Sequence, residues 1–163
     1  MTDATLRVRP LDLADPEQAA AFLELLDHYA HDPMGGGTGL KPEVKEQLVE
    51  ALRQLPHFHG ALASLDGQAA GLINCFVGFS TFAARPLLNV HDIVVRDGRR
   101  GAGIGQALLA WAADRARELD CCKLTLEVLS NNHRALAAYQ RAGFAPYVLD
   151  PAAGQALFLQ KAL

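Results

Sequence analysis

Cysteines are few in this sequence, and nothing in it is built to cross a membrane. Three cysteines occur among 163 residues, two of them adjacent at Cys121 and Cys122, and no CxxC pair is present. This excludes a disulfide framework and a zinc ribbon and predicts a reduced, cytoplasmic protein. The first ten residues lack the apolar core of a signal peptide, and no apolar run reaches the roughly 18 residues that span a bilayer. No membrane partner is expected.

An excess of positive charge is absent too. Fifteen lysines and arginines face 18 aspartates and glutamates, for a formal net charge of −3, whereas general nucleic-acid-binding proteins are basic. No nucleic-acid partner is therefore expected, although Arg96, Arg99 and Arg100 make one basic spot. Half of the residues are hydrophobic, which is enough for one globular domain with its own core. We expect a single domain over residues 1–163.

Clustered metal ligands are missing as well. His57 and His59 lie two residues apart on one face of an expected strand, but no third ligand accompanies them. Zinc sites in proteins use three or four protein ligands. No metal is therefore expected.

The most informative stretch of the chain runs from Leu87 to Gly105, LLNVHDIVVRDGRRGAGIG. Its first half is apolar and rich in β-branched residues, which predicts a buried strand. A basic turn then leads through Gly101-Ala102-Gly103-Ile104-Gly105 into an apolar helical pattern. Such a turn exposes backbone N–H groups at a helix N-terminus, whose positive partial charge binds anions. The stretch predicts a phosphate site; the alternative is a plain strand-to-helix turn with solvated arginines.

The glycine spacing separates this turn from two familiar nucleotide-binding loops. The Lys and Ser or Thr of a P-loop are absent. A dinucleotide-binding turn needs GxGxxG, but the third glycine falls one residue early at Gly105, and position 106 is Gln. The pattern Arg100-x-x-Gly103-x-Gly105 instead resembles the pyrophosphate loop, R/Q-x-x-G-x-G/A, of the GNAT N-acetyltransferase superfamily, which binds acetyl-coenzyme A.

Hydrophobic periodicity and turn residues divide the chain into strands and helices. Expected strands are residues 5–9, 57–65, 68–82, 87–95, 123–129, 144–149 and 155–162, and expected helices are residues 16–31, 42–55, 105–119 and 133–142. The order is β-α-α-β-β-β-α-β-α-β-β. The β-α-β unit over residues 87–129 requires a parallel strand pair, whereas the hairpins are antiparallel. The prediction is an α/β fold with helices on both faces of a mixed, mostly antiparallel sheet.

A second motif supports the same family. Asn132, Tyr139 and the run Arg141-Ala142-Gly143-Phe144 resemble the N-x(6)-Y-x-x-x-G-F signature of GNAT proteins, and the predicted element order matches their fold over essentially the whole chain. The resemblance implies an acetyl-CoA-dependent N-acetyltransferase whose acceptor, a primary amine, attacks the thioester directly through a tetrahedral intermediate. Two alternatives stay open: a catalytically silent acyl-CoA-binding or regulatory protein, and a protein or peptide N-acetyltransferase. A homodimer also stays open.

The resemblance assigns coenzyme-binding roles to residues of both motifs. Backbone N–H groups of the central strand would hold the pantetheine arm and the thioester carbonyl, the glycine turn would hold the pyrophosphate, Asn132 would contact the pantetheine, and Arg141 or Arg134 would reach the 3′-phosphate. The strand and turn residues concerned are Ile93, Val94, Val95, Arg100, Gly101, Ala102, Gly103, Ile104 and Gly105.

Acetyl transfer to an amine also needs an acid and a base. Tyr139 is the candidate acid for the leaving thiolate, its alternative role being a core tyrosine on an amphipathic helix. The candidate bases are His91, Asp92 and Glu127. Strand alternation points His91 and Asp92 to opposite faces, so at most one of them is expected to face a given cavity. His91 could serve directly or could be a buried, hydrogen-bonded histidine, and Glu127 could act through water or pair with an arginine.

The acceptor is expected to be a small primary amine. Residues 77–82 and the pair His91-Asp92 look similar to diamine and polyamine acetyltransferases of the superfamily, which carry an acidic pair on the central strand; here its first member is histidine. Tyr29, Asp32, Phe82 and His91 are the candidate acceptor residues, because a carboxylate and aromatic faces suit a cationic amine. The four-glycine stretch from Gly35 to Gly39 could close over the site.

Overall fold

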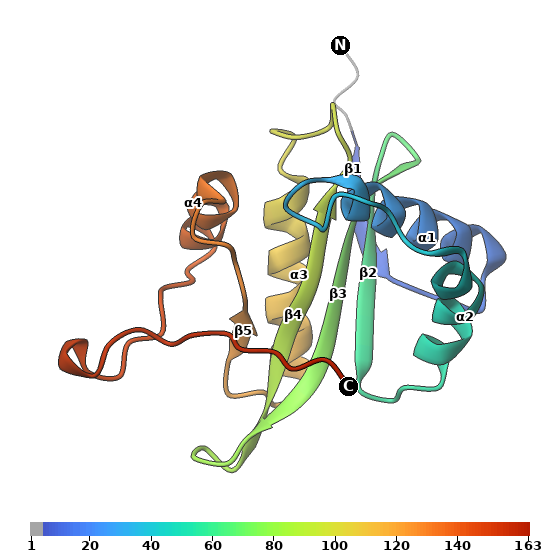
Figure 1. The fold of residues 1–163 in the computed structure, drawn as a ribbon. Helices are drawn as coiled ribbons and strands as arrows, with labels where there is room; N and C mark the ends of the chain where they lie inside the picture. The colour runs from blue at the N-terminus through green and yellow to red at the C-terminus, as the bar shows by residue number, and fades with distance from the viewer. Residues whose placement is uncertain (1–4) are drawn as a thin grey trace.

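The computed structural model describes residues 5–163, which form one five-stranded sheet with helices packed around it (Figure 1). In chain order the elements are β1 (Leu6–Pro10), α1 (Pro16–His31), α2 (Pro42–Arg53), β2 (Phe58–Leu65), β3 (Gln68–Ser80), β4 (Arg85–Val95), α3 (Ile104–Glu118), β5 (Leu124–Leu126), α4 (His133–Arg141) and the short 3₁₀ helix η1 (Pro151–Ala153). None of the helices in the described part is long and apolar enough to span a membrane.

The sheet has the strand order β1-β2-β3-β4-β5. The first four strands are antiparallel neighbours, and β5 runs parallel to β4. The parallel pair is joined through α3, as a β-α-β unit requires. This confirms the predicted mixed sheet with one parallel pair next to its antiparallel strands.

Helices cover both faces of the sheet, and each face has its own core. On one face Phe22 and Leu25 of α1 pack, fully buried, over Leu72 of β3 and Val94 of β4, with α2 at the side. On the other face α3 runs alongside β4 (Figure 1) and buries Leu108 against the opposite side of the sheet. Strand alternation explains why both faces are apolar: neighbouring residues of β3 and β4 point into different cores.

Gly71 sets how closely α3 approaches the sheet. A Cβ built at this position would lie 2.6 Å from Cγ2 of Ile104 and 3.0 Å from the carbonyl oxygen of Val94. Real side chains do not tolerate such contacts, so only glycine lets the first turn of α3 settle on β3. Gly71 is thus a point of close approach between the backbone of β3 and α3.

We expect Gly71→Ala to destabilise the fold by about 1–3 kcal/mol, the usual cost of overpacking a well-packed core. The measurement is the free energy of unfolding from a denaturant titration. Gly78→Ala is the matched control, because a Cβ there comes no closer than 3.3 Å to the side chain of Leu87. Equal stability of the two variants would show that α3 can shift without cost.

The two expected C-terminal strands do not form, and the prediction for residues 144–149 and 155–162 is corrected. The chain after α4 has no ladder, is exposed from residue 145 onward, and contains only η1. A strand is stable only when a neighbour supplies a hydrogen-bonding edge, and β5, predicted over residues 123–129, is only three residues long. Pro146 and Pro151 lack the N–H that a ladder needs.

Candidate active site

Two cavities adjoin along β4. The larger, of about 800 Å³, lies between the C-terminal end of α1, the end of β4, the N-terminus of α3 and α4. The smaller, of about 230 Å³, lies between α1, α2 and strands β2 to β4. Most predicted site residues line the larger one: Tyr29, Asp32, Ile93, Val94, Val95, Arg100, Gly101, Gly103, Ile104, Gly105, Asn132, Tyr139 and Arg141. His91 lines the smaller one.

The glycine turn has the geometry of an anion site. Gly101 and Gly103 have φ of 84° and 79°, in the left-handed region that favours glycine. Gly103 is the N-cap of α3, and no side chain caps the N-terminus of this helix. Its first N–H groups therefore face the larger cavity with the positive end of the helix dipole behind them. A phosphate group fits this arrangement.

Arg100 is held at the mouth of the anion site by two carboxylates. Its guanidinium lies 3.0 Å from Asp97 and 3.5 Å from Asp32. Asp32 also accepts a hydrogen bond from the Met34 N–H at 2.8 Å, which ties it to the turn after α1. Asp32 was predicted to contact the acceptor; it lines the larger cavity, where its carboxylate already pairs with Arg100 and accepts the N–H of this turn. An amine acceptor would have to compete for it.

The end of β4 presents free backbone donors to the larger cavity. β5 pairs with β4 only over Leu88–Val90, so the strands part before Ile93. The Arg96 N–H donates to the Ala70 carbonyl of β3 at 2.9 Å. Because N–H directions alternate along a strand, those of Ile93 and Val95 point away from β3, toward the side that β5 has left. Two donors on a rigid strand suit a carbonyl oxygen that gains negative charge.

Tyr139 faces this cavity from α4 with a strongly raised pKa. Burial is the main cause, and the neighbouring Tyr29 adds to it, so the pKa of Tyr139 rises to about 12. The phenol is therefore protonated throughout the neutral and mildly alkaline range. The Tyr139 ring also meets Phe144 edge-on, with 6.0 Å between the ring centroids. Packing thus orients a tyrosine that can donate a hydrogen bond into the cavity.

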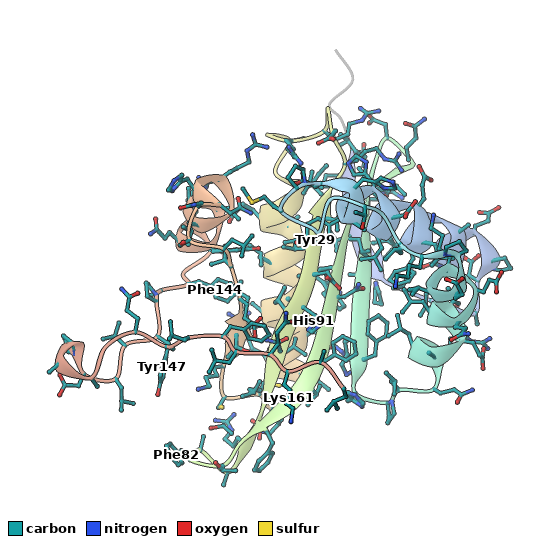
Figure 2. All side chains as sticks on the ribbon, in the orientation of Figure 1. Tyr29, Phe82, His91, Phe144, Tyr147 and Lys161 are labelled. Carbon is teal, nitrogen blue, oxygen red and sulfur yellow. The ribbon has the colours of Figure 1, made fainter. Side chains whose placement is uncertain are left out.

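A bulge in β4 overturns the expectation that His91 and Asp92 face opposite ways. Asn74 of β3 pairs with Asp92, but the next residue, Cys75, pairs with Val90, so His91 is the extra residue. A bulge places two residues opposite one and breaks strand alternation. Both His91 and Asp92 consequently line the smaller cavity. Figure 2 shows His91 over the strands of the sheet, below Tyr29 in this view.

His91 has a defined set of neighbours. Its ring meets Phe76 nearly at a right angle, with 5.3 Å between the ring centroids. Its Nδ1 lies 3.3 Å from Oδ1 of Asn89, whose Nδ2 donates to Oγ1 of Thr125 at 3.1 Å. Because Asn89 turns its N–H toward Thr125, its oxygen is left for the histidine, and this favours a proton on Nδ1. Nε2 of His91 then carries the free lone pair.

Asn74 is a site residue that the sequence analysis missed. It is only 3% exposed, and its Nδ2 donates to Oδ2 of Asp92 at 3.1 Å. Within residues 5–163 its Oδ1 is buried without a hydrogen-bond partner. A signal was present in the sequence, because an asparagine inside the apolar run GLINCFVGF is out of place in a strand interior.

Three predicted residues lie outside both cavities. Phe82 is fully exposed in the turn between β3 and β4 and lies at the far end of this hairpin in Figure 2, so it does not form an aromatic wall of the site. Glu127 is exposed just after β5, and Ala102 is exposed on the glycine turn. In residues 5–163 no group of three or more His, Cys, Asp or Glu side chains could hold a metal ion.

Comparison with known proteins agrees with the fold. The model of the acetyltransferase (GNAT) family matches residues 22–144. Streptothricin acetyltransferase from Streptomyces lavendulae is 45% identical over 87 residues, which are 53% of this chain and 44% of that enzyme. The chain thus spans less than half the length of this relative.

Solved structures show the same fold at low identity. An aminoglycoside acetyltransferase from an uncultured soil metagenomic sample, in complex with trehalose, has a TM-score of 0.76 at 18% identity and covers 97% of this chain and 96% of its own. The aminoglycoside N-acetyltransferase AAC(6′)-Iy in complex with CoA has a TM-score of 0.74 at 15% identity, with 98% and 97% covered.

The sheet parts at its parallel strand pair, and the glycine turn lies at the N-terminus of α3, a place where phosphate groups often bind in proteins. The family model covers well over half of the chain. The chain belongs to the acetyltransferase (GNAT) family.

Proposed function

We propose that this chain transfers the acetyl group of acetyl-CoA to a primary amine of a small molecule. The observation that carries this proposal is the continuity of the site along β4. An anion-binding turn follows the strand, free N–H groups of Ile93 and Val95 line its end, and His91 and Asp92 lie just before them in the adjoining cavity. Related proteins named for streptothricin and aminoglycosides support a small-molecule acceptor.

The residues of the larger cavity fit the coenzyme. When bound, acetyl-CoA supplies an activated thioester. The N–H groups at the start of α3 and the guanidinium of Arg100 would hold the pyrophosphate. One polar atom of Asn132 already has a hydrogen-bond partner, because its Oδ1 accepts the Ala135 N–H at 3.2 Å and caps α4. Its Nδ2 stays free to donate to the pantetheine arm, and Arg141, in the same cavity, suits a further phosphate.

The amine must lose a proton before it attacks. An alkyl ammonium with a pKa near 10.4 lies about 3.4 pH units above neutrality, or roughly 4.6 kcal/mol from its neutral form at pH 7. We assign the removal of this proton to Nε2 of His91, whose other nitrogen faces Asn89. Asp92, beside it in the same cavity, holds the amine. Glu127 lines neither cavity, so it is too poorly placed to act as the base.

Release of coenzyme A thiol tests the function directly. With acetyl-CoA and a panel of polyamines, amino acids, arylalkyl amines, aminoglycosides and peptides, we expect thiol release that depends on a small amine. The reaction is followed with a thiol reagent, and the acetylated amine is identified by mass spectrometry. The control omits the amine. Release with peptides alone would favour a peptide acetyltransferase, and coenzyme binding without any transfer would favour the silent acyl-CoA-binding protein.

A further inference from the structure

We propose that the smaller cavity selects the acceptor, and that the acceptor is an amine with a compact apolar body, such as an arylalkyl or branched alkyl amine. This inference rests on the proposed acetyl transfer and narrows its substrate class. Two other kinds of amine are then expected to be poor acceptors: polyhydroxylated amines, which include aminoglycosides, and extended polycations. Three features of the cavity support this choice of acceptor: its walls, its polar corner and its position on β4.

Apolar side chains form most of the wall. They come from α1, α2, β2 and β3: Phe22, Leu26, Leu48, Leu52, Phe58 and Phe76. Phe58 and Phe76 lie against each other at 5.4 Å between ring centroids and 51° between planes, so the aromatic part of the wall is fixed. At about 230 Å³ this cavity has less than a third of the volume of the larger one, so it suits a compact body.

At the polar corner, Oδ1 of Asn74 and the carboxylate of Asp92 can accept hydrogen bonds from a ligand. A carboxylate oxygen only accepts, so the amide of Asn74 turns its N–H toward Asp92 and leaves Oδ1 without a partner among the described residues. A buried acceptor in this state is unfavourable until a donor reaches it. A ligand that brings one N–H group or ammonium beside an apolar body satisfies this corner and the wall together.

The cavity also lies where an acceptor must lie. His91 and Asp92 line it, and Ile93, the next residue of β4, lines the coenzyme cavity. Tyr29 lies near both cavities. It lines the larger one, and its pKa is raised by burial and then by the charges of Asp92, which lines the smaller cavity, and Asp32. An amine at the mouth of the smaller cavity is thus next to the donors of Ile93 and Val95. Sugar hydroxyls inside would lose their hydration against apolar walls, and a second ammonium would find no second carboxylate among the lining residues.

The first test compares substrates on the wild-type enzyme. We expect kcat/KM for phenethylamine and isoamylamine to exceed that for spermidine and for an aminoglycoside by about 10-fold or more. A preference for spermidine or the aminoglycoside would overturn this inference and leave the acetyltransferase proposal standing. Coenzyme binding with no transfer to any amine would overturn both.

The second test uses variants of the cavity. Asn74→Leu removes the unpartnered acceptor while keeping the branched outline of the side chain, and should raise KM for phenethylamine by roughly 10-fold, with a smaller change in kcat and the same calorimetric affinity for coenzyme A. Phe58→Leu enlarges the cavity and should shift the preference toward bulkier arylalkyl amines. The matched control is Phe79→Leu, on β3 but largely exposed and outside the cavity. Unchanged KM in a folded, coenzyme-binding Asn74→Leu, or equal effects of Phe58→Leu and Phe79→Leu, would refute the selective cavity.

Discussion

The Tyr139→Phe variant is expected to lose roughly 10- to 10³-fold in kcat, the scale of removing one hydrogen-bond donor to charge that develops in the transition state, with little change in affinity for coenzyme A. The substitution keeps the ring that packs against Phe144 and removes only the hydroxyl. Because the pKa of Tyr139 is raised to about 12, the hydroxyl carries its proton at every pH at which the enzyme would be assayed. Steady-state kinetics with a saturating amine measure the effect.

The raised pKa of Tyr139 also indicates whether its hydroxyl transfers a proton or only donates a hydrogen bond. A thiol near pKa 8.5 lies about 3.5 units below Tyr139, so complete proton transfer to a free thiolate would be uphill by roughly 4.8 kcal/mol. Tyr139 therefore stabilises the leaving sulfur chiefly by donating a hydrogen bond as the C–S bond breaks. The alkaline side of the pH profile of kcat should then not report Tyr139, since its ionisation lies near pH 12.

The control for this variant is Tyr147→Phe, which removes the same hydroxyl from an exposed tyrosine. It should leave kcat unchanged. If Tyr139→Phe and Tyr147→Phe were equally active, Tyr139 would serve only to pack α4 against Phe144, and the acid would have to be sought elsewhere.

Gly103→Val should weaken binding of coenzyme A by about 10- to 100-fold. Gly103 has φ of 79° and caps the N-terminus of α3. A β-branched residue in this left-handed conformation costs about 1–3 kcal/mol, so the turn relaxes and its N–H groups no longer converge on one phosphate. Titration calorimetry with coenzyme A measures the loss.

Substitution of a second glycine, Gly67, serves as the control that distinguishes backbone strain from loss of coenzyme binding. Gly67 has φ of 80° in the turn between β2 and β3, also with open space around its Cβ position, and it lines neither cavity. Gly67→Val should carry a similar conformational cost in the denaturant titration and bind coenzyme A like the wild type. Wild-type affinity in Gly103→Val would remove the glycine turn from the coenzyme site.

The coenzyme half of the site could be predicted from sequence because it is local. Strand, glycine turn and helix N-terminus follow one another within residues 87–105, and their backbone geometry depends on near neighbours and on glycine itself. The second motif is similarly compact, with Asn132 capping the helix that carries Tyr139. The larger cavity brings both motifs together, as the β-α-β-α order implies.

The acceptor half depends on register and packing between strands, which a single strand's pattern does not contain. Alternation alone separates His91 from Asp92, and only the pairing of β4 with β3 reveals the bulge that turns both into one cavity. The same pairing puts Asn74 beside Asp92. Phe82 was expected to contact the acceptor because it is aromatic and near His91 in the sequence. The hairpin of β3 and β4 is long enough to place it far from the site instead.

The chain's sequence by itself indicated the family through its resemblance to two GNAT motifs. It also indicated the mixed sheet, the glycine turn before α3 and the place of Tyr139 on α4, because these three follow from short-range periodicity, glycine conformation and helix capping. The tertiary structure alone decided the bulge at His91, the partnership of Asn74 with Asp92, the walls of the smaller cavity and the absence of strands after α4. These features arise between segments far apart in the chain: a bulge is a relation between two strands, a cavity is what several elements leave unfilled, and a strand exists only where another edge accepts its hydrogen bonds.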